Sequence, residues 1–126
     1  MTVATLSEHE TWAVLRLAFW HLQRRRFSSA ERLARGLLRL DIHNGWAWYY
    51  YGEARREQGD AREAQKGYEQ AAHILRRPEI YLRLAEVCLA IAERPAARAA
   101  LEEAARLDPA PDLRGRIRAL KRRAEN

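Results

Sequence analysis

The sequence of 126 residues contains a single cysteine, Cys88, together with only four prolines and six glycines. One cysteine cannot form an intramolecular disulfide, and this usage is typical of a reducing compartment. No run approaches the roughly 18 apolar residues that a membrane span needs. The first ten residues lack the basic start and the apolar run of a secretory signal. These absences predict a cytoplasmic protein without a membrane span.

Patterns for catalysis and metal binding are also missing. The four histidines are scattered along the chain, at His9, His21, His43 and His73. No two of them stand at i, i+4, and there is no H-E-x-x-H motif for zinc. Adjacent Glu102 and Glu103 point to different faces of a helix and cannot act as a carboxylate pair. Cys88 is expected to be a buried, inert thiol. We therefore expect no enzyme activity, no metal and no cofactor.

What the sequence does contain is a repeating pattern in its middle. Trp48, Tyr51 and Gly52 stand at the spacing W-x2-[L/Y]-G, and Ala64 and Tyr68 stand at A-x3-[F/Y]. This spacing is typical of the tetratricopeptide repeat (TPR), a helix–turn–helix unit of about 34 residues. The small residues let the two helices of the unit approach closely, while the aromatic residues fill the space around the contact.

The same pattern recurs on both sides of this unit. A shift of 34 residues toward the N-terminus carries Gly52 onto Ala18, and a shift of 33 residues toward the C-terminus carries it onto Ala85. Three repeats are about the minimum for a stable stack. We therefore predict an all-α fold, a TPR solenoid of three helix-turn-helix repeats plus a C-terminal capping helix. The expected single domain is 1–126, with repeats at about 11–42, 45–77 and 78–109 and the capping helix at 111–124.

Local signals place the starts of the first three helices. Ser7-x-x-Glu10 and Ser28-x-x-Glu31 match the capping box, in which a hydroxyl and a carboxylate satisfy free amide groups at a helix start. Asn44 is positioned to cap the third helix. The pattern predicts helices over 7–24, 29–40 and 45–57, and Asp60 with Glu63 is expected to cap the helix that follows.

The first helix of each repeat carries a stripe of residues that we expect on the concave surface of the stack. The stripe consists of Trp12, Leu15, Phe19, Leu22, Trp46, Tyr49, Glu53, Arg56, Leu82, Glu86 and Leu89. Apolar, aromatic surfaces of this kind mark binding sites. We expect one continuous apolar groove for an extended or helical peptide segment, because an open groove encloses too little of a small molecule. The alternative is that some of these residues pack against the N-terminal segment, the final helix or a second copy of the chain.

Positive charge is concentrated at the C-terminus. Residues 111–126 hold six basic and two acidic residues, so four of the six net positive charges lie there. Such a segment is compatible with binding to nucleic acid or to an acidic surface. It contains no aromatic residue for base stacking, which makes nucleic acid the less favoured reading. A solvated face of the capping helix is the simpler one.

With three repeats identified, the sequence resembles the TPR chaperones of bacterial type III secretion, in particular the class II chaperones of the translocator proteins. The resemblance rests on LRLAFWHLQRRRFSSAERLARGLLRLD, LDIHNGWAWYYYGEARREQGDAREAQKGYEQAAHI and PEIYLRLAEVCLAIAERPAARAALEEA, with the run from Pro78 to Cys88 as its most distinctive detail.

The resemblance implies a cytoplasmic chaperone whose groove holds an extended, proline-containing segment of a hydrophobic export client until secretion. Phe19, Trp46 and Tyr49 are then the expected main contacts, and a homodimer is compatible with it. The shorter TPR chaperones of the same export systems, which hold a small export component or a needle subunit, and a generic TPR scaffold are the alternatives.

Overall fold

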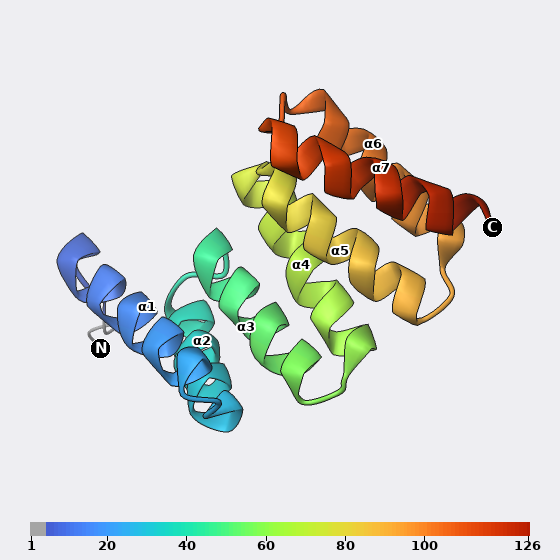
Figure 1. The fold of residues 1–126 in the computed structure, drawn as a ribbon. Coiled ribbons are helices and arrows are strands. Elements are labelled where there is room, and N and C mark those ends of the chain that lie inside the picture. The colour runs from blue at the N-terminus through green and yellow to red at the C-terminus, as the bar shows by residue number, and fades with distance from the viewer. Residues whose placement is uncertain (1–4) are drawn as a thin grey trace.

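The computed structural model describes residues 5–126, and within this range the secondary structure consists of seven α-helices and no strand (Figure 1). The helices are α1 Glu8–Gln23, α2 Phe27–Leu40, α3 Gly45–Glu57, α4 Ala61–Leu75, α5 Pro78–Ala90, α6 Arg94–Arg106 and α7 Pro111–Glu125. No helix among the described residues is long and apolar enough to cross a membrane.

The helices pack as a stack of hairpins. α1 packs on α2, α3 on α4, and α5 on α6, while α2 contacts α3 and α4 contacts α5 to join one hairpin to the next. Figure 1 shows the hairpins following one another along the stack, from blue to red. α7 packs on both α5 and α6, where the first helix of a further repeat would lie. The predicted TPR solenoid of three hairpins with a C-terminal capping helix is confirmed.

The caps of α1, α3 and α4 follow the sequence signals. Ser7 and Glu10 form the predicted reciprocal capping box, with bonds of 3.0 and 3.1 Å. The Asn44 side chain accepts a bond of 3.1 Å from the amide of Ala47. The carboxylate of Asp60 accepts one of 3.1 Å from the amide of the third residue beyond it, at the start of α4.

The predicted capping box at Ser28 is wrong. α2 begins at Phe27, and its N-cap, Arg26, makes no side-chain capping bond. The reason lies in the preceding turn, where Arg25 has a φ of 60° and the amide of Arg26 donates to the carbonyl of His21 at 2.8 Å. This tight turn starts the helix early and places Ser28 inside its first turn.

α3 and α4 approach each other closely at two glycines, Gly52 and Gly67. A Cβ atom added to Gly67 would lie 2.9 Å from both the Cα and the N of Gly52, a distance that real Cβ atoms do not reach. A Cβ added to Gly52 would lie 2.9 Å from the ring of Tyr68. The sequence pattern correctly paired Gly52 with Ala64, whose carbonyl oxygen lies 3.3 Å from a Cβ added to Gly52, but it missed Gly67.

Replacing Gly67 by alanine is expected to lower the free energy of unfolding by about 1–3 kcal/mol, because the new methyl group meets backbone that cannot move aside. Gly36→Ala is the matched control, since a Cβ at this position of α2 has nothing within 4 Å. It should raise the stability by about 0.5–1 kcal/mol through helix propensity. Urea unfolding of both variants measures the two changes. If Gly67→Ala and Gly36→Ala change the free energy of unfolding equally, the close approach of α3 and α4 at Gly67 is contradicted.

Candidate functional site

The surface formed by α1, α3, α5 and α7, called the inner face below, begins with an aromatic cluster. Trp12 and Phe19 of α1 are 48% and 47% exposed. The ring of Phe19 lies 6.2 Å from that of Tyr50, and the ring of Trp46 lies 5.8 Å from that of Tyr49 in an edge contact. α1 and α3 therefore share one apolar, partly exposed surface.

Next to this cluster, the inner face carries a network of ion pairs. The carboxylate of Glu53 on α3 contacts the guanidinium groups of Arg56 and Arg83, at 3.5 and 3.3 Å. Glu86 on α5 contacts Arg83 at 3.4 Å, Arg56 at 3.9 Å and Arg116 of α7 at 3.1 Å. The network joins three of the four helices of the inner face, α3, α5 and α7.

A buried tyrosine on α4 forms a hydrogen bond to this network. Tyr68 of α4 is fully buried, and its hydroxyl donates a hydrogen bond of 2.6 Å to Glu53. Burial raises the pKa of Tyr68, and the negative charge of Glu53 raises it further. Burial, followed by the charge of Glu53, also raises the pKa of Tyr49. The two hydroxyls therefore stay protonated at neutral pH.

The structure brings together part of the predicted stripe. Phe19, Trp46 and Tyr49 lie in the aromatic cluster, and Trp12 is exposed on the same helix as Phe19. Leu22 lines a pocket of about 290 Å³ together with Glu53 and others. The other polar members of the stripe, Arg56 and Glu86, belong to the ion-pair network. Their role in binding stays a prediction.

Two members of the stripe are core residues instead. Leu15 is 3% exposed and clusters with Leu37 and Ala47, and Leu82 is 1% exposed in the core shared with α7. Leu89 is half-buried against that same core. These side chains fill the space between neighbouring helices of the stack, so they do not line an open surface. Leu15 and Leu82 therefore do not line the expected groove, whereas a groove formed by the other members of the stripe stays a prediction.

Sequence reasoning missed three residues of this site. Tyr50 completes the aromatic cluster, while Arg83 and Arg116 complete the ion-pair network. The i, i+3 spacing of Arg83 and Glu86 was a readable signal. The contact between Arg116 and Glu86 spans 30 residues, so only the packing of α7 on α5 creates it.

Cys88 lies away from this surface and is 1% exposed. Burial raises its pKa to about 11, so the thiol is protonated at neutral pH, and the expectation of a buried thiol is confirmed. Within the described part of the chain, no group of three His, Cys, Asp or Glu residues is arranged to hold a metal ion.

The sequence matches no model of a protein family and no curated protein sequence. Solved structures are similar, however. The chaperone SycD of Yersinia enterocolitica, in complex with a peptide of the translocator YopD, is 21% identical over 94% of this chain and 95% of that chain, with a TM-score of 0.84.

Two further structures agree with this one. PcrH, a protein of Pseudomonas aeruginosa, in complex with the chaperone-binding region of PopD is 22% identical, covers 98% of this chain and 97% of that chain, and has a TM-score of 0.86. An alternative dimer of SycD is 22% identical over 94% of both chains, with a TM-score of 0.84. The chain thus has the fold of the type III secretion translocator chaperones, and the resemblance seen in its sequence is confirmed at the level of the fold.

The bond between Tyr68 and Glu53 gives a prediction about pH. Tyr68→Phe should lower the free energy of unfolding at pH 8 by about 1.5–3 kcal/mol, because it removes a buried hydrogen bond to a charged group. The folded pKa of Tyr68 is raised above the ordinary value of 10.0. Tyr68 therefore contributes its full stabilisation below pH 10. This stabilisation is lost as the pH rises above 10, because the hydroxyl of Tyr68 then ionises in the unfolded chain but not in the folded one. In urea unfolding between pH 8 and pH 11, the free energy of unfolding should fall less steeply with rising pH in Tyr68→Phe than in the wild type.

Tyr81→Phe is the control for this experiment. The hydroxyl of Tyr81 accepts only a bond of 3.3 Å from the exposed Arg76. At pH 8, Tyr81→Phe should therefore lower the free energy of unfolding by less than Tyr68→Phe does. If the free energy of unfolding falls equally steeply above pH 10 in the wild type and in Tyr68→Phe, the prediction is contradicted.

Proposed function

We propose that this protein is a cytoplasmic, non-enzymatic chaperone that holds a segment of a protein client of an export system on its inner face. The observation that carries this proposal is the exposed aromatic cluster of α1 and α3. Nearly half of the Trp12 and Phe19 side chains is open to solvent, and burying such surface against a client gains about 25 cal/mol per Å². The fold supports the same role, since SycD and PcrH with this fold hold translocator peptides.

The residues of the inner face also indicate which kind of client segment would bind there. An aliphatic or aromatic side chain of the client would pack among Trp12, Phe19 and Trp46, with Leu22 and Tyr49 beside them. The polar part of the segment would then run along Glu53, Arg56 and Glu86. Because these charges already pair with one another, they supply hydrogen-bonding positions and little net attraction. Apolar burial therefore supplies most of the affinity.

A second apolar strip on α1 supports pairing of two copies. Leu17 and Trp20 are 44% and 38% exposed. On a helix they lie on a different side from Trp12 and Phe19, so a second copy and a client would use different surfaces of α1. The SycD structure described as an alternative dimer shows that a protein of this fold pairs.

The double variant Trp12→Ala, Phe19→Ala should fail to capture the client. The test is a pull-down at high salt from extract of cells that make the protein, with the tagged wild type and variants as baits. Loss of two hot-spot aromatics should weaken binding by about 2 kcal/mol or more each. Both side chains are exposed, so the variant should fold like the wild type, and its circular dichroism melt checks this.

Leu17→Ala, Trp20→Ala is the matched control, with similar exposed residues removed from the other side of α1. It should retain the client and, in light scattering, lose any dimer. Equal capture by the wild type and both double variants would refute the inner face as the client site.

The salt dependence of capture separates this role from binding through the basic helix. In the described part of the chain, Arg118, Lys121, Arg122 and Arg123 of α7 take part in no ion pair. A nucleic acid or acidic surface held by these residues would dissociate steeply as salt rises. We expect client capture on the inner face to change little from low to high salt, and to persist in Arg118→Ala, Arg122→Ala. Release of the client at moderate salt, or its loss in this variant, would move the function to α7.

A further inference from the structure

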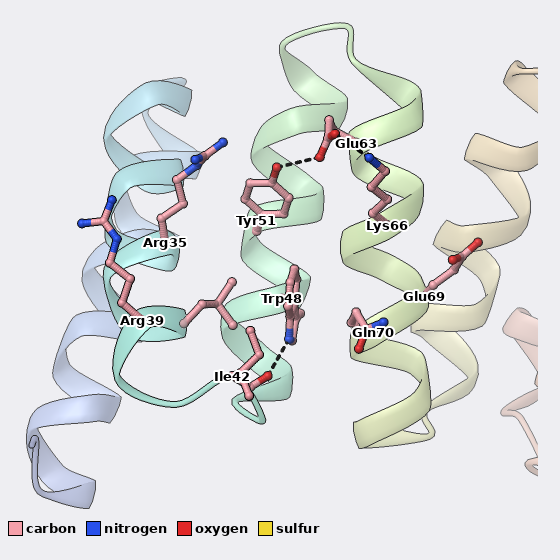
Figure 2. A pocket seen from close by; sticks show the side chains of 10 residues that line it. Arg35, Arg39, Ile42, Trp48, Tyr51, Glu63, Lys66, Glu69 and Gln70 are labelled. Atoms are coloured by element: carbon pink, nitrogen blue, oxygen red, sulfur yellow. Dashed lines mark hydrogen bonds and ion pairs between the residues drawn. The ribbon is translucent and has the colours of Figure 1, made fainter.

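A groove of about 800 Å³ lies away from the inner face, between α2 and α4 (Figure 2). Its floor is formed by Trp48 and Tyr51 of α3. Trp48 and Trp46 are two residues apart, so their side chains point about 200° apart around the helix. α3 therefore contributes one tryptophan to the inner face and another to a groove on its opposite side.

The floor of this groove is held in place before any ligand binds. The indole N–H of Trp48 donates to the carbonyl of Ile42 at 2.8 Å, and its ring contacts that of Tyr51 edge-on at 6.1 Å. The hydroxyl of Tyr51 donates to Glu63 at 2.9 Å. A preorganised surface loses little entropy when a ligand binds to it.

Apolar side chains on α2 and the loop after it continue the floor to the mouth of the groove. Leu38 is half-buried there, and Ile42 is 56% exposed. An aliphatic side chain this open, beside an aromatic floor, is an unfilled apolar contact surface. The groove is open on the side facing away from α3, as Figure 2 shows, so it encloses too little of a small molecule and suits a segment of a macromolecule.

Charge separates the two walls of the groove. On α2, Arg35 is held by Glu31 at 2.8 Å and lies over the ring of Tyr51, whereas Arg39 forms no ion pair within residues 5–126. On α4, Lys66 pairs with Glu63 at 2.9 Å, and Glu69 forms no ion pair within residues 5–126. Arg39 is therefore a free cation on the α2 wall, next to the apolar mouth at Ile42, and it complements a carboxylate that flanks an apolar anchor.

We propose that this groove docks an amphipathic helix of a second protein, other than the client, through an apolar anchor on the Trp48 floor and an acidic residue beside Arg39. Two neighbouring helices with a groove between them are a surface on which a third helix packs. The inner face lies on the other side of α3, so the chaperone can hold a client and this second protein at once. The proposal does not depend on what the inner face binds.

The test uses a phage library of random peptides of about 16 residues, a little over four helical turns. The library is selected on the wild-type protein after depletion on Ile42→Asp. We expect enriched peptides with apolar residues at i and i+3 or i+4 and with flanking Asp or Glu. A peptide synthesised from this consensus should bind Arg39→Glu and Ile42→Asp at least about tenfold more weakly than the wild type. Both positions are exposed, and thermal melts confirm that the variants fold.

Two further measurements sharpen the result. Exchanging the acidic residue of the peptide for lysine should restore binding to Arg39→Glu and weaken binding to the wild type. Trp12→Ala, Phe19→Ala should bind the peptide like the wild type, because it changes only the inner face. The proposal is overturned if no peptide is enriched, if the enriched peptides lack acidic residues or bind Arg39→Glu normally, or if the inner-face variant loses them.

Discussion

The close approach of α3 and α4 at Gly52 and Gly67 is the constraint on which the rest of the structure depends. With no side chain between the two backbones, Tyr68 lies directly against Gly52, and its hydroxyl reaches across to Glu53. Glu53 is thereby fixed on the inner face, where it contacts Arg83 of the next hairpin. One steric condition in the middle hairpin thus sets both the packing of the stack and the position of its ion-pair network.

The inner face divides into two parts with different physical roles. Exposed aromatic rings on α1 and α3 offer apolar surface that gains free energy when it is covered. The charged part joins α3, α5 and α7, and its carboxylates pair with its guanidinium groups. It therefore holds the helices in register while adding little net charge. A client on this face would be retained by the first part and aligned by the second.

α3 is the helix that both candidate surfaces share. Its aromatic residues point to opposite sides, with Trp46 in the inner cluster and Trp48 in the groove between α2 and α4. Both indoles make defined contacts, an edge contact with Tyr49 in one case and a hydrogen bond to Ile42 in the other. The two aromatic sides of α3 therefore belong to two different candidate surfaces.

The sequence by itself determined the helices, their order and the hairpin stack, because helical periodicity, the caps at Ser7, Asn44 and Asp60 and the recurring small residues are local or strictly periodic signals. Only the tertiary structure decided which apolar residues stay open. Leu15 and Phe19 belong to one stripe, yet a neighbouring helix buries the first and leaves the second exposed. The pairing of Arg116 with Glu86 and the groove over Trp48 likewise arise between segments far apart in sequence, where no local pattern records the contact.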